Sequence, residues 1–155
     1  MEKLKRLIFI VCVAMGLVQT SSVAHAQAPT LIVINHSSYI HRVSYTTLYA
    51  YLDIVAKTYP IYKGTYRIYL EDKLPSSITF PKNALGGHTA QVKAYINVKG
   101  MVEAKLDPYI AITHELAEMA VDPHLEDLTM EINDNNVDYF ILNGHTVAGF
   151  RRRNT

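Results

Sequence analysis

The segment between Asp107 and Pro123 constrains the fold more than any other part of the sequence. Asp107 followed by Pro108 is typical of a helix start, and Pro123 requires the helix to end near Val121. Within this helix the polar side chains share one stripe, and the other positions are almost wholly apolar. The stripe consists of Thr113, His114, Glu115, Glu118 and Asp122. The sequence therefore predicts a largely buried helix crossed by a single polar stripe.

The rest of the chain predicts a mixed α+β fold. Six segments have the apolar runs or alternation that are typical of strands. They are residues 31–34, 65–71, 91–99, 129–132, 137–142 and 146–150. A second helix is expected from the cap residue Ser44 to Tyr59, and the proline- and glycine-containing segment 72–90 is predicted to be a long loop. We expect one domain over residues 27–155, in which two helices pack on a small mixed sheet and the helix that begins at Pro108 is central.

Residues 1–26 have the organisation of a secretory signal peptide. Basic residues at positions 3–6 precede an apolar run over residues 7–18, and Ala24 and Ala26 occupy the positions that signal peptidase reads. The twelve apolar residues fall short of the ~20 that span a bilayer, which argues against a membrane anchor. We therefore expect cleavage after residue 26 and a secreted or periplasmic protein without a stable membrane anchor.

The charge distribution argues against nucleic acid as a partner and concentrates carboxylates in one region. Without residues 1–26, twelve Lys and Arg face thirteen Asp and Glu, so no positive excess favours nucleic-acid binding. Ten of these thirteen acidic residues lie between Glu103 and Asp138, where Lys105 is the one basic residue. Because the single cysteine, Cys12, leaves with the signal peptide, His and carboxylate side chains would have to hold any metal.

The polar stripe has the spacing of a metal-binding helix. His114 and Glu118 are four residues apart, so their side chains lie on one face and can reach the same ion. Glu115 directly follows His114, as the general base does in the HExxH zinc helix, and Glu118 replaces the second histidine. A solvated face usually mixes cations with carboxylates, whereas this stripe has three carboxylates and no Lys or Arg. A divalent cation would neutralise them.

Residues 114–123, read as HELAEMAVDP, resemble the HExxExxxDP signature of small bacterial and phage proteins that are similar to zincin metallopeptidases. Residues 84–88 resemble the Ala-Leu-Gly-aromatic-His loop of these proteins, although Gly87 stands in the aromatic position. Residues 131–134 resemble their downstream Glu-x-x-Asp, and the similarity covers most of residues 40–150. It implies a zincin-like fold in which residues 91–99 form the edge strand over the cleft.

The same resemblance implies a metal centre that hydrolyses a peptide bond in a peptide or protein substrate. Glu131 is expected to be the third metal ligand beside His114 and Glu118, with Asp122 and Asp134 as alternatives. This ligand set favours Zn²⁺, although Mn²⁺ or Fe²⁺ also fits His and carboxylate ligands.

Two further residues receive roles from this interpretation. Glu115 is expected to act as the general base. His88 is expected to donate a hydrogen bond to the substrate; the alternatives are that it binds the metal or that it is a loop histidine without a partner. Two other functions stay open: a non-catalytic, metal-stabilised binding protein on a degenerate zincin fold, and an exported domain with neither metal nor activity. The sequence predicts neither the identity of the substrate nor the oligomeric state.

Overall fold

A mixed four-stranded sheet forms one layer of the computed structural model, which describes residues 27–127 and 138–151. Its strands are β1 (Thr30–Asn35), β2 (Thr65–Glu71), β3 (Gly86–Thr89) and β4 (Lys93–Asn97). The strand order is β1-β2-β4-β3, with β1, β2 and β4 parallel and β3 antiparallel to β4 at one edge. The predicted α+β fold with a mixed sheet is confirmed.

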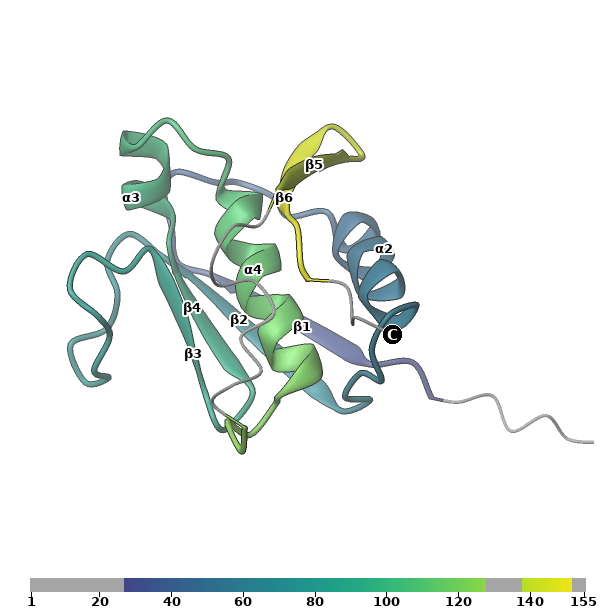
Figure 1. Cartoon of the computed structure of the whole chain (residues 1–155). Coiled ribbons are helices and arrows are strands. Elements are labelled where there is room, and N and C mark those ends of the chain that lie inside the picture. The colour runs from purple at the N-terminus through teal and green to yellow at the C-terminus, as the bar shows by residue number, and fades with distance from the viewer. Residues whose placement is uncertain (1–26, 128–137, 152–155) are drawn as a thin grey trace, which may run out of the picture.

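Three helices and a hairpin complete the described structure. Helix α4 (Pro108–Val121) packs against β4 and β3, and α2 (Tyr45–Ala56) lies beside α4. The short helix α3 (Val98–Glu103) directly follows β4. The hairpin of β5 (Tyr139–Leu142) and β6 (His145–Ala148) packs on α4, so that α4 lies between the sheet and the hairpin (Figure 1).

The core lies between the sheet and the apolar sides of α2 and α4. In β2 and β4 every second residue is buried, as the alternation in the sequence predicts. The largest fully buried side chains are Tyr51, Tyr66, Leu48, Leu52, Ile68, Leu70, Ile96, Met101, Ile112, Leu116, Met119 and Val55. Because each such aliphatic side chain stabilises the fold by roughly 1.5–3 kcal/mol relative to an exposed one, this layer fixes where α4 lies on the sheet.

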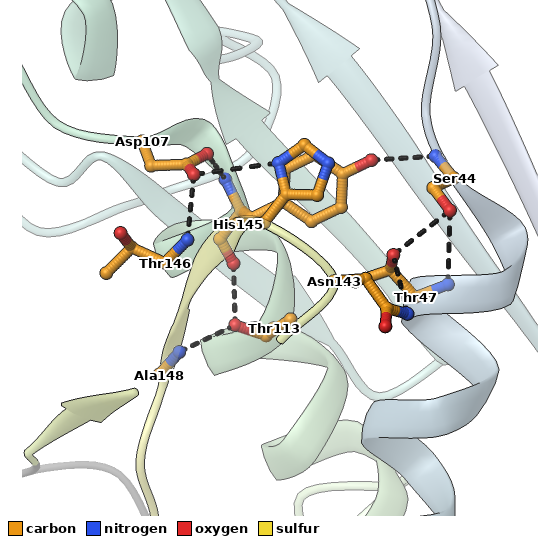
Figure 2. Close-up of polar contacts among 9 residues, drawn as sticks. Ser44, Thr47, Asp107, Thr113, Asn143, His145, Thr146 and Ala148 are labelled. Carbon is orange, nitrogen blue, oxygen red and sulfur yellow. Dashed lines mark hydrogen bonds and ion pairs between the residues drawn. The ribbon is translucent and has the colours of Figure 1, made fainter. Parts of the chain in front are cut away.

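Hydrogen bonds fasten the hairpin to the N-terminal half of α4 (Figure 2). Asp107, which caps α4, accepts a hydrogen bond from the Thr146 N–H at 2.9 Å. Thr113 Oγ1 donates to a carbonyl one turn earlier in α4 at 2.6 Å and accepts from the Ala148 N–H at 2.9 Å. Since Ala148 pairs with Tyr139 across the hairpin, these bonds also position Tyr139.

A stacked pair of rings joins the hairpin to the start of α2 as well. The ring of His145 stacks on that of Tyr109, with centroids 3.7 Å apart, and its Nδ1 lies 3.6 Å from Asp107 Oδ2. The Tyr109 hydroxyl in turn accepts a hydrogen bond from the Ser44 N–H at 2.7 Å. Figure 2 shows how these contacts join the hairpin, α4 and the start of α2.

The structure corrects the predictions for residues 72–99. Strand β3 lies within the segment 72–90 that was expected to be a loop, because its sequence Gly-Gly-His-Thr has no apolar alternation. The strand predicted over residues 91–99 ends at Asn97, whose side chain accepts a hydrogen bond from the Gly100 N–H at 2.8 Å and starts α3. Residues 91–99 are therefore not the edge strand: β4 lies inside the sheet, and β3 forms the edge.

Several other expectations are modified or lie outside the described residues. The helix predicted to reach Tyr59 ends at Ala56, four residues before Pro60. The strand predicted over residues 129–132 lies outside the described residues. The predicted signal peptide of residues 1–26 does too, so export of the protein stays a prediction. Within residues 27–127 and 138–151, no helix is long and apolar enough to cross a membrane.

We predict that Thr113→Val destabilises the protein by roughly 1–3 kcal/mol, because the buried Ala148 N–H would lose its acceptor. Thr113→Ser is the matched control: it keeps the hydroxyl and removes one methyl group, at a cost of about 0.8 kcal/mol. Urea unfolding followed by circular dichroism measures both changes. Equal destabilisation by valine and serine would contradict the role of this hydroxyl.

Candidate metal centre

Helix α4 carries two of the three side chains that form the centre. Glu115 and Glu118 are three residues apart and are therefore neighbours on the helix surface. The polar stripe that contains them is not a solvated face, because Thr113 is fully buried and Glu115 is only 6% exposed. Carboxylates in such a position need a partner that compensates for lost hydration.

Strand β3 supplies the third side chain, His88. In the sheet His88 pairs with Ala94 of β4, which is fully buried on the side covered by α4. Residues paired across two strands point to the same face, so His88 is directed toward α4. The position of the His88 side chain thus depends on the register of an edge strand. The positions of the Glu115 and Glu118 side chains depend on the rotation of α4 about its axis.

The three side chains converge in a poorly exposed region. His88 Nδ1 lies 3.0 Å from Glu115 Oε2 and 3.6 Å from Glu118 Oε2. The side chains of His88 and Glu115 are each 8% exposed and that of Glu118 is 12% exposed. Each residue offers one ligand atom, and these three atoms lie within 4.8 Å of one another. This group could hold a metal ion.

The chemistry of the donors fits a divalent cation. Two carboxylates and one imidazole are ligands that zinc and other first-row divalent metals accept. In addition, His88 Nε2 is buried and has no hydrogen-bond partner within the described part of the chain. With ionised carboxylates and a neutral imidazole, a doubly charged ion would balance the charge of the group.

Gly86 provides the space for the Glu115 carboxylate. A Cβ atom at this position would lie 3.2 Å from Glu115 Oε1 and 3.3 Å from the side chain of Ile96. Gly87 lies against a different neighbour: a Cβ atom there would approach the ring of Phe80 to 2.6 Å. The ring of Phe80 thus occupies the space beside position 87.

His114 lies next to the centre but does not belong to the converging group. Its Nε2 is 3.4 Å from Glu118 Oε1, and its side chain is 26% exposed. His114 and Glu115 also line a pocket of about 240 Å³ between α4, α3 and the hairpin. His114 is therefore the more accessible of the two histidines, at the boundary between the centre and the pocket.

The remaining predicted ligands are placed differently. The Asp122 carboxylate accepts hydrogen bonds from the backbone N–H groups of Glu126 at 2.9 Å and Asp127 at 3.1 Å, so it stabilises the turn after α4. Glu131 and Asp134 lie outside the described residues, and a ligand role for either stays a prediction. The predicted roles of Glu115 as base and His114 as ligand are likewise untested.

Tyr51 lies near the centre and keeps its proton. Burial raises the pKa of its hydroxyl far above the ordinary value, and the negative charge of Glu118 raises this pKa further. The protonated hydroxyl donates a hydrogen bond to the Ala148 carbonyl at 2.8 Å. Tyr51 therefore binds the hairpin and is excluded as a base near neutral pH.

No protein-family model matches this chain, and no curated protein or solved structure matches it either. The resemblance to zincin-like proteins stays a prediction. Only that resemblance gave a reason to place His88 near the helix. The sequence Gly-Gly-His does not itself indicate a strand, so the residues alone did not predict this contact.

We predict that Gly86→Ala lowers the affinity for Zn²⁺ roughly 10-fold, because the added methyl group displaces the Glu115 carboxylate. Gly87→Ala is the matched control, since its methyl group meets the Phe80 ring instead. Competition with a fluorescent zinc chelator measures both affinities. If the two variants lose affinity equally, or if neither does, Gly86 has no special role in shaping the centre.

Proposed function

We propose that the protein is a metal-dependent hydrolase of peptide bonds, with one Zn²⁺ ion held by His88, Glu115 and Glu118. The observation that carries this proposal is the convergence of one imidazole and two carboxylates within 4.8 Å at low exposure. Three protein ligands with a mixture of His and carboxylate are typical of catalytic zinc sites, which keep a further position for water or substrate. When bound, the ion supplies Lewis-acid chemistry and activates water for hydrolysis at neutral pH.

The ligand set differs from the set expected from the HExxE spacing. In this proposal His88 is a ligand, which was the alternative role considered for it, and Glu115 is a ligand instead of the base. This choice is supported by the 3.0 Å contact between His88 and Glu115 and by the 8% exposure of both side chains.

His114 is the residue we assign to proton transfer. It lines the pocket, is 26% exposed, and lies 3.4 Å from a carboxylate oxygen of Glu118. An imidazole in this position can exchange protons with solvent and with a group bound in the pocket, because each of its ring nitrogens can donate or accept a proton. Glu118 orients the ring through the Nε2 contact.

We predict that the purified protein binds one zinc ion per chain, and that His88→Ala and Glu118→Gln each weaken binding by about 100-fold or more. His124→Ala is the control, because this exposed histidine contacts the Ala90 carbonyl and the ring of Tyr62 but none of the three proposed ligands. Zinc content after dialysis and the zinc-dependent rise in melting temperature are the measurements. If both variants bind zinc as the unaltered protein does, the proposed ligand set is wrong.

Glu115→Gln distinguishes the two assignments for Glu115. As a ligand, this residue is needed for zinc affinity, so the variant loses zinc and chelator-sensitive cleavage of a peptide library together. As a general base, it would be needed only for cleavage, and the variant would retain zinc. Stoichiometric zinc with a raised melting temperature and no cleavage by the unaltered protein would contradict hydrolysis and favour a metal-stabilised binding protein.

A further inference from the structure

The pocket beside the metal centre has walls that differ sharply from the centre itself. His114 and Glu115 form its polar end, and Gly86 of strand β3 also borders it. Its other lining residues are apolar or aromatic: Leu85, Met101, Leu106, Ile110, Ala111 and Tyr139. Among the described residues that line the pocket, the side chains that can carry a charge therefore lie only at the end next to the metal centre.

The size of the pocket suits one side chain. A cavity of roughly 150 Å³ with aliphatic walls holds a benzene ring, whereas pockets for drug-sized ligands usually have about 300–1,000 Å³. The volume of about 240 Å³ lies between these values. It accommodates a leucine or phenylalanine side chain but is small for a complete organic cofactor.

The mouth of the pocket carries exposed apolar groups. Leu106 is 38% exposed and Tyr139 is 56% exposed, and they approach the pocket from the α3–α4 connection and from β5. Tyr139 is held there through the pairing of β5 with β6 and the hydrogen bond from Ala148 to Thr113. An apolar side chain that entered between these residues would bury surface on both, which favours binding.

We propose that this pocket binds one apolar side chain, of leucine or phenylalanine size, from a peptide whose backbone lies at the metal centre. The proposal rests on the proposed function for the statement that the peptide is a substrate. The pocket adjoins His114 and Glu115, so a side chain within it places the neighbouring peptide bond beside these residues. Acidic and basic side chains are disfavoured because most of the wall is apolar and cannot compensate for their lost hydration, and Glu115, the one acidic residue among the described lining residues, is already engaged by His88 at 3.0 Å.

The test compares peptides that differ at one position. Capped tripeptides Ala-X-Ala with leucine, phenylalanine, aspartate or lysine at X are titrated into the protein, first without metal and then with zinc. Methyl resonances of Met101, Leu106 and Ile110 report binding. We expect leucine and phenylalanine peptides to bind roughly 10- to 100-fold more tightly than the charged ones and to shift these three resonances.

Two variants show whether the preference originates in the pocket. Ala111→Leu fills the pocket from the helix and is expected to abolish the preference, while Ala56→Leu, at an exposed position of α2, is the control and retains it. If Ala111→Leu does not fold, Leu106→Glu decides alone: Leu106 is 38% exposed, and a charge there is expected to remove the preference for apolar peptides.

Three results would overturn the proposal: equal binding of apolar and charged peptides, a preference that survives both pocket variants, or binding of a small aromatic molecule without binding of any peptide. Its failure is distinct from failure of the proposed function. A preference for apolar peptides without zinc-dependent cleavage would contradict hydrolysis and leave the pocket assignment intact. Cleavage that shows no preference at any position would support hydrolysis and contradict the pocket assignment.

Discussion

Two carboxylates one helical turn apart in a poorly hydrated region are the constraint on which the described structure depends. Glu115 and Glu118 have side-chain exposures of 8% and 12%, and burying such charges is costly unless a cation or hydrogen-bond donors compensate for the lost water. His88 supplies the facing imidazole from strand β3, which packs against α4. A divalent ion bound among the three would compensate both charges at once, which is why we propose that this group binds a metal.

The surrounding elements hold these side chains in place from two sides. On one side, the buried residues of β2 and β4 fix α4 on the sheet, and Gly86 lets the edge strand approach Glu115. On the other, Asp107 and Thr113 bind the hairpin through the backbone of Thr146 and Ala148. The metal centre and the apolar pocket therefore share α4 as a common wall, and a displacement of this helix would disturb both.

The sequence predicted α4 well because its ends and its single stripe are local signals. Asp107, Pro108 and Pro123 mark the boundaries, and apolar periodicity identifies the buried side. Strand β3 could not be predicted in this way, since two glycines, a histidine and a threonine carry no alternation and the strand exists through pairing with β4. The position of His88 depends on that strand pairing. Helical spacing identifies only residues of the same helix, so it indicated His114 as the histidine ligand. Asp122 shows the reverse case: it lies on the predicted stripe, but the turn after α4 engages its oxygens.

The central claim is that His88, Glu115 and Glu118 bind a single divalent ion together. A crystal structure of the zinc-loaded protein, with anomalous diffraction recorded on both sides of the zinc absorption edge, tests it most directly. The account predicts one anomalous peak per chain, about 2.0–2.2 Å from a ring nitrogen of His88 and from an oxygen of each carboxylate. A peak bound by His114 without His88, or no peak between β3 and α4, would contradict it.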